Sequence, residues 1–299
     1  MPSASVQAAC KLPVYWDVNR PSPPGLDLHT GFVSVPDGAV TELGILPGLA
    51  IANGATYDAG SNKWFGTDRQ LLSPDETRYT YWAADPAADE IHVVDIATGR
   101  DRIIYNGPTL YIPISFEQDV IYLVHAINLR QGAFEKLYRV DPVGGALTLV
   151  PGSDHHMYRG WGLISDGAAW GIDYRVQGDT YVYSVLRLDL ATAVVTPWME
   201  GPPGDQILPV GIDRLHRLYV SDHQQLWRLG APGQGEMLAD GGQVSGAGDV
   251  GSSTTFVSDS QGVWFAGRGS VWFYSDTEPP RRFAAGPSDA DVFPAGPCV

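Results

Sequence analysis

The chain has 299 residues and a formal net charge of −15 at pH 7. This charge argues against binding of nucleic acid through phosphate neutralisation and against docking on an anionic membrane. No segment has the ~18 consecutive apolar residues that a membrane-spanning helix requires. Hydrophobic residues make up 44% of the chain, which is ample for a core. The acidic balance fits a soluble protein with a cationic or neutral ligand, or a Ca²⁺ site.

The first nine residues, 1–9 (MPSASVQAA), are small and polar and lack the apolar centre of a signal peptide. We interpret them as a disordered remnant left after a signal was removed, with an ordinary disordered start as the alternative. We expect residues 10–299 to form one domain and the protein to be a monomer.

One pattern recurs six times: an alternating apolar strand, a turn rich in Asp, Pro or Gly, and a second apolar strand. In one copy Asp95 leads into the turn, and Gly99 allows the chain to reverse. We expect Asp95, Asp141 and Asp189, which recur at this turn, to accept backbone N–H groups. The starts lie roughly 40 to 60 residues apart, the period of four-stranded propeller blades. The six copies are Phe32–Leu43, Ile91–Ile104, Leu137–Val150, Val185–Met199, Leu226–Leu238 and Val271–Ala284.

Another strand pair precedes five of these copies, so each unit has four strands. A single unit cannot bury both of its faces, and the units must therefore stack. We predict an all-β fold, a six-bladed β-propeller of four-stranded antiparallel blades, with a β-sandwich or a two-domain all-β chain as the alternative. The preceding pairs are Leu71–Trp82, Tyr111–Ala126, Trp161–Tyr174, Leu208–Asp222 and Thr254–Gly267.

Closure of a propeller brings strands from both chain ends into one blade. We predict that its inner strand comes from Asp291–Val299 and the other three from Leu12–Val18 and the Phe32–Leu43 hairpin. Cys10 and Cys298, the only two cysteines, then lie close together and form a disulfide. In the chain-entropy model such a bridge is worth on the order of 4–5 kcal/mol. It implies an oxidising compartment, and two free thiols are the alternative.

The segment Leu71–Trp82, followed by Glu90–Tyr105, resembles the SPDG-type repeat of TolB-like and WD40-like propellers from bacterial envelopes. Ser73 to Asp75 match the Ser-Pro-Asp-Gly turn, Glu76 replaces its Gly, and Ile91–Gly99 matches the D-x-x-T-G half. The match covers about one blade, and the others agree in outline. The resemblance implies a secreted, periplasmic or cell-envelope propeller. It transfers no catalytic residue, because the motif is a structural turn.

In a propeller the inner strands line a central channel, and the links that enter them rim one mouth. The link Ser153–Gly162 carries the most chemically active groups. Its candidates could bind a ligand or a metal, and the alternative is an exposed polar loop with one core Trp. They are Asp154, His155, His156, Tyr158, Arg159 and Trp161.

The long, Gly-rich connection Leu46–Trp64 includes a possible extra hairpin. At the end of this connection, Trp64 could stack on a ligand while Asp68 and Arg69 fix the polar groups of that ligand. A buried Asp68–Arg69 pair that braces the loop is the alternative.

Three aspartates complete a possible acidic rim at the channel mouth. Asp154, Asp205 and Asp249 could hold Ca²⁺ through carboxylate oxygens, and ordinary turn aspartates are the alternative.

The sequence contains no GxSxG elbow, HExxH helix, P-loop or GxGxxG motif. We therefore favour a secreted or envelope binding propeller that recognises a protein, peptide or glycan on the face carrying Trp64 and His155. The alternative is an extracellular lyase or hydrolase acting on a sugar or lactone, with a metal at the central channel and a His that moves the proton.

Overall fold

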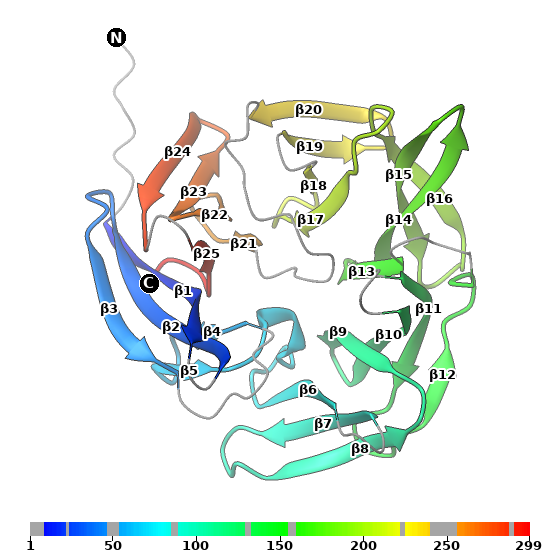
Figure 1. Ribbon diagram of the computed structural model, residues 1–299, viewed down its shortest axis with the longest axis horizontal. Helices are drawn as coiled ribbons and strands as arrows, with labels where there is room; N and C mark the ends of the chain where they lie inside the picture. The colour runs from blue at the N-terminus through cyan, green and yellow to red at the C-terminus, as the bar shows by residue number, and fades with distance from the viewer. Residues whose placement is uncertain are drawn as a thin grey trace.

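The computed structural model describes residues 9–21, 24–46, 54–84, 89–128, 133–154, 160–221, 225–239, 256–286 and 290–299. Small antiparallel sheets are arranged in a ring, and the first and last strands, β1 (Cys10–Pro21) and β25 (Asp291–Pro294), lie side by side in it (Figure 1). In these ranges the helical structure is the short 3-10 turn η1 (Arg69–Leu71). No helix there has the length and hydropathy to cross a membrane. Residues 1–8, most of the predicted remnant, lie outside the described residues.

Three sheets have four strands each, paired in chain order from the centre of the ring outward (Figure 1). The predicted hairpins Leu137–Val150, Val185–Met199 and Leu226–Leu238 form the outer strand pairs of these sheets. The strands are β9 (Tyr111–Glu117), β10 (Val120–Asn128), β11 (Ala133–Val140) and β12 (Leu147–Leu149); β13 (Gly160–Ser165), β14 (Ala168–Gln177), β15 (Thr180–Asp189) and β16 (Val195–Glu200); and β17 (Leu208–Ile212), β18 (Leu218–Ser221), β19 (Leu226–Ala231) and β20 (Gln234–Ala239).

The sheet before them has three strands, β6 (Arg78–Ala84), β7 (Asp89–Asp95) and β8 (Asp101–Gly107). The strand predicted to start at Leu71 is reduced to one bridge, between Leu72 and Tyr79. The reason is the turn that follows at once, in which Pro74 has no N–H to donate to a ladder. The predicted extra hairpin is present as β4 (Thr56–Asp58) and β5 (Lys63–Phe65).

The predicted closure of the ring is confirmed. β25 pairs with β1 through Val14 and Pro294, and it also pairs with β22 through Gly267 and Val292. One eight-stranded sheet therefore contains both chain ends. Because of this fusion and the three-stranded sheet, the count of six blades stays a prediction. The strands are β1 (Cys10–Pro21), β2 (Pro24–Val35), β3 (Val40–Ile45), β21 (Phe256–Ser258), β22 (Val263–Arg268), β23 (Ser270–Ser275), β24 (Glu278–Ala284) and β25 (Asp291–Pro294).

The predicted disulfide joins Cys10 to Cys298 across 288 residues, with the two Cα atoms 5.6 Å apart. Beside it, the backbones of Lys11 and Val299 exchange two hydrogen bonds, of 2.8 and 3.0 Å. The Cys298 N–H also donates to the carboxylate of Asp259, in the turn between β21 and β22, at 3.3 Å. The bridge therefore fastens both chain ends to the neighbouring part of the ring.

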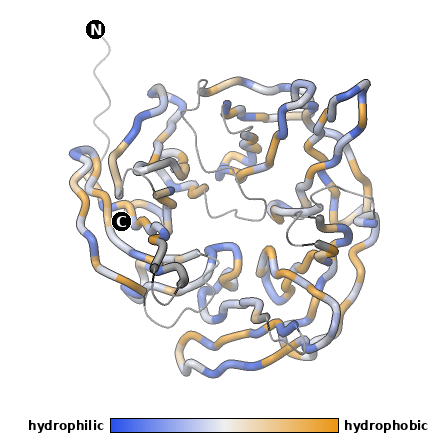
Figure 2. Tube along the Cα trace, in the orientation of Figure 1, coloured by the Kyte–Doolittle hydropathy of each residue, from blue (hydrophilic) through white to orange (hydrophobic). Residues whose placement is uncertain are grey.

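The core consists of apolar layers between adjacent sheets, and apolar and polar residues alternate along many strands (Figure 2). Trp161, on β13, shares one layer with Leu137 of the preceding sheet and Leu188 of its own. Trp264 occupies a similar place in the layer that β1 and β25 share with β22 and β23. Stacking of neighbouring sheets thus buries the faces that a lone sheet would expose.

The recurrent turn aspartates have the predicted structural role. Each one accepts a hydrogen bond from the backbone N–H of a residue two or three positions later, which holds the hairpin turn. The donors are Thr98 to Asp95 at 2.8 Å, Val143 to Asp141 at 2.8 Å and Thr192 to Asp189 at 2.9 Å.

Candidate functional site

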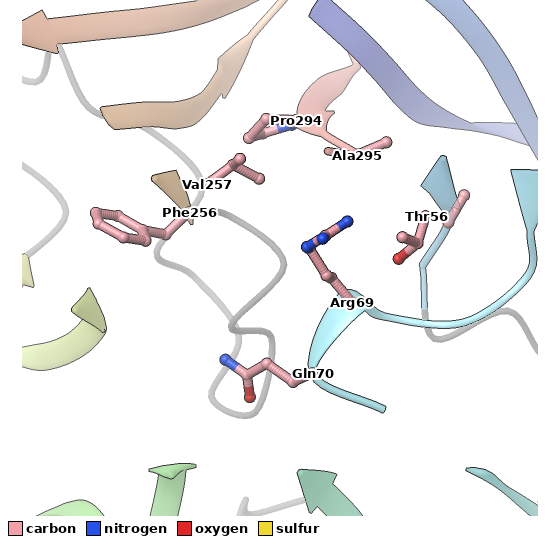
Figure 3. Close-up of a pocket in the computed structure, with 8 residues that line it drawn as sticks. Thr56, Arg69, Gln70, Phe256, Val257, Pro294 and Ala295 are labelled. Carbon is pink, nitrogen blue, oxygen red and sulfur yellow. The ribbon is translucent and has the colours of Figure 1, made fainter. Parts of the chain in front are cut away.

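A cavity of about 210 Å³ lies beside the point where the ring closes (Figure 3). Its walls come from four segments that are distant in sequence: the start of β4, the η1 turn, β21 and the end of β25. We call it the Arg69 cavity. It is lined by Ala55, Thr56, Arg69, Gln70, Phe256, Val257, Pro294 and Ala295.

Backbone hydrogen bonds hold these segments together. Ala295 donates its N–H to the Pro13 carbonyl at 2.8 Å and accepts from the N–H of Tyr57 at 2.9 Å. The β4–β5 hairpin is thereby tied to the C-terminal segment. The Thr56 hydroxyl donates to the Thr67 carbonyl at 2.8 Å, which fixes the start of η1 relative to β4. Closure of the ring therefore also builds the cavity.

The cavity combines apolar walls with three polar side chains, those of Thr56, Arg69 and Gln70. The Arg69 guanidinium points into it, whereas Phe256 and Val257 stand on the opposite wall (Figure 3). Arg69 is 44% exposed, and its Nη2 forms an ion pair with Glu76 at 3.0 Å. The Gln70 Oε1 atom is buried and has no hydrogen-bond partner in the structure as described. The site therefore offers one cation beside an apolar surface.

Asp68 lies next to this cavity and is almost fully buried. Its Oδ1 atom has no hydrogen-bond partner among the described residues, and burial raises the pKa of the carboxyl well above its ordinary value. The alternative of a buried Asp68–Arg69 pair is wrong, because Arg69 pairs with Glu76 instead. Gly54, at φ +121°, permits the arrangement, since a Cβ there would lie 2.0 Å from Asp68 Oδ1.

Trp64 belongs to the aromatic layer beneath the β4–β5 hairpin rather than to the cavity wall. Its ring centroid lies 5.3 Å from that of Tyr57 and 5.9 Å from that of Phe32. The ring is half-buried, and stacking on a ligand stays a prediction.

Comparisons with known proteins give a likeness of overall shape. No protein-family model matches the chain, and no curated protein matches it. Among solved structures, TolB from Acinetobacter baumannii is 11% identical with a TM-score of 0.48, over 94% of this chain and 63% of that one. A chain of a nidogen/laminin complex is 10% identical with a TM-score of 0.49, over 96% and 100%. The β-propeller domain of the Trilobed protease from Pyrococcus furiosus is 13% identical with a TM-score of 0.47, over 94% and 85%.

These values assign no ligand and no reaction to the chain. The propeller fold rests on the strand pairing described above. The resemblance to the SPDG-repeat family stays a prediction.

The second predicted site, the link Ser153–Gly162, is described only at its ends. Trp161 is 1% exposed, and its Nε1 donates to the Ser153 carbonyl at 3.1 Å, so this ring is part of the core. Asp154 is exposed. The remaining predicted residues, His155, His156, Tyr158 and Arg159, lie outside the described residues.

The predicted metal site also stays a prediction. Asp154 and Asp205 are exposed, and Asp249 lies outside the described residues. In the ranges that the structure describes, no three His, Cys, Asp or Glu side chains are grouped so as to hold a metal ion.

Sequence reasoning found Arg69 but missed the rest of the cavity. The signal that could have identified it is the closure of the ring. Once Asp291–Val299 is predicted as an inner strand, the segments that lie beside this strand are expected to face the channel. Nothing in the residue types marks the missed positions, which are Ala55, Thr56, Gln70, Phe256, Val257, Pro294 and Ala295.

Proposed function

We propose that this protein is a secreted or envelope β-propeller binding protein that holds the carboxylate end of a peptide ligand in the Arg69 cavity. The observation that carries this proposal is the Arg69 guanidinium, which points into a cavity with apolar walls (Figure 3). The Cys10–Cys298 disulfide supports an oxidising compartment.

The cavity matches the end of a peptide chain. A guanidinium has five N–H donors, so Arg69 can bind a carboxylate while one nitrogen keeps its contact with Glu76. Phe256, Val257 and Pro294 supply a surface for the side chain of the terminal residue.

The volume of the cavity limits what it can hold. At about 210 Å³ it is smaller than the pockets of roughly 300–1,000 Å³ that enclose a drug-sized ligand. It therefore suits one terminal residue, and the remainder of the ligand would cross the face of the ring.

N-acetyl-L-leucine is a suitable probe, because it carries a carboxylate, an N–H and one apolar side chain. We expect binding with a dissociation constant on the order of 1 mM, as for a ligand of about twelve heavy atoms. N-acetyl-L-leucinamide, which lacks the charge, should bind about tenfold more weakly. Chemical-shift titration by NMR measures both constants.

Arg69→Gln should abolish the preference for the carboxylate, because it removes the cation and keeps an amide. Arg175→Gln is a matched control, since Arg175 is also exposed and also pairs with a glutamate, Glu200, at 3.0 Å. The control should leave binding unchanged. Equal binding of the acid and the amide, or full binding by Arg69→Gln, would contradict the proposed function.

A further inference from the structure

A second surface lies on the hairpin formed by β14 and β15. Opposite residues of these strands are Tyr174 with Tyr183 and Val176 with Tyr181, so the four side chains share one face of the hairpin. We call these four residues the tyrosine face. Val176 is 68% exposed and Tyr181 is 49% exposed, which is unusual for neighbouring large apolar groups on one strand pair.

The rings of the tyrosine face are inclined to one another. The Tyr174 and Tyr181 centroids are 5.0 Å apart with the planes at 78°, and Tyr183 lies 6.0 and 6.3 Å from them at 44° and 46°. Inclined rings form ridges and notches rather than a flat shelf. Such a surface accepts compact rings or branched side chains between its ridges, whereas a sugar stacks on a flat ring face.

The position of the tyrosine face follows from the strand order. Strands of a sheet alternate in direction, so the β14–β15 turn lies on the same side of the ring as the links that join one sheet to the next. One of these links is in contact with it, because the Gly204 N–H donates to the Tyr181 carbonyl at 2.8 Å. The tyrosine face therefore lies on the same side of the ring as the links between sheets.

Acidic groups flank the tyrosine face. Asp179 lies in the β14–β15 turn, and Asp205 follows Gly204 in the adjoining link; both side chains are exposed. The whole chain carries a net charge of −15. These charges favour a basic partner and disfavour an acidic one.

We propose that the tyrosine face is a docking site for a basic, proline-containing peptide segment of another protein. Proline rings of an extended segment fit between inclined aromatic rings, and the segment loses little conformational entropy because it is already extended. Its Lys or Arg side chains reach Asp179 and Asp205. This site does not depend on the Arg69 cavity, because it needs no carboxylate.

The probe is a decapeptide of sequence PPRPPKPPRP, acetylated and amidated so that it has no terminal carboxylate for Arg69. We expect saturable binding by fluorescence anisotropy that weakens as salt is added. A peptide with every Pro replaced by Gly keeps the charges and should bind at least about tenfold more weakly, because it loses the ring contacts and the preformed extended conformation. A peptide with its basic residues replaced by Glu should not bind.

Two substitutions test the face itself. Tyr181→Ser should weaken binding about tenfold and Val176→Ser about threefold, because each removes exposed apolar contact area without touching the core. Val143→Ser is the matched control, since Val143 is also 68% exposed but lies in the turn between β11 and β12, in a different sheet. Circular dichroism should be unchanged in all three variants.

The inference is overturned if both face variants bind the peptide as tightly as the wild type, or if the Gly-substituted peptide binds equally well. Binding of cellohexaose that Tyr181→Ser abolishes, without peptide binding, would assign the face to glycans and also overturn it. Arg69→Gln should bind the decapeptide as the wild type does, because this peptide has no terminal carboxylate. Failure of the acetyl-leucine experiment therefore does not affect the outcome of the decapeptide experiment.

Discussion

Replacement of both Cys10 and Cys298 by serine is expected to lower the free energy of unfolding by about 4–5 kcal/mol. The bridge closes a loop with a sequence separation of 288 residues, and without it the unfolded chain regains the freedom of its ends. The loss should appear as a lower midpoint in urea unfolding followed by tryptophan fluorescence. A bridge of this strength is a large fraction of the stability of an ordinary domain.

Wild-type protein in reducing agent provides the control for the double variant. Reduction should lower the wild-type midpoint to that of the variant and should not change the variant itself. A loss below about 1 kcal/mol in both experiments would mean that hydrogen bonds and packing close the ring without help from the bridge. The pairing of β25 with both β1 and β22 would then carry closure alone.

The closure of the ring could be predicted from the sequence because it follows from periodicity. Apolar alternation and turn residues located the hairpins, including Ile91–Ile104 as β7 and β8. A ring built from such units must join its ends, which placed Asp291 beside the N-terminal strands and the two cysteines together. Each step uses local sequence patterns and one topological rule.

The cavity could not be predicted in the same way, because its walls meet only across the closed ring. Phe256 and Pro294 are apolar residues on short inner strands, and their types do not distinguish a cavity wall from a core position. The partner of Arg69 was also unpredictable, since Glu76 reaches it through the turn that follows η1. Local patterns specify strands, whereas contacts between inner strands depend on how the sheets stack.

Asp68 is the residue at which local and global requirements conflict. Its backbone carbonyl caps η1 by accepting from the Leu71 N–H at 2.9 Å, and this contact would survive a change of side chain. The side chain itself is buried with an unpartnered oxygen, beside a glycine whose Cβ would clash with it. A buried polar group without a partner costs stability, so such positions are often retained for function.

Asp68→Asn is expected to raise the free energy of unfolding by about 1–3 kcal/mol near neutral pH, because the amide is neutral at every pH, whereas the buried carboxyl must either stay charged without a partner or bind a proton. Burial raises the pKa of Asp68, so the folded state keeps a proton at pH values where the unfolded state has lost it. The wild type is therefore not penalised by this group below the ordinary pKa of 3.8, and it loses stability as the pH rises through the raised pKa.

The gain from Asp68→Asn should consequently shrink toward zero as the pH is lowered to the ordinary pKa of a carboxyl. Urea unfolding of both proteins at several pH values measures it. Asp205→Asn is the control, because Asp205 is exposed and its replacement should change stability by less than about 0.5 kcal/mol at every pH. A loss of stability in Asp68→Asn that grows as the pH rises above 3.8 would instead mean that the charged carboxylate is stabilised in the folded protein. Asp68 would then stabilise the fold beside the Arg69 cavity, whereas the raised pKa predicts that it lowers the free energy of unfolding.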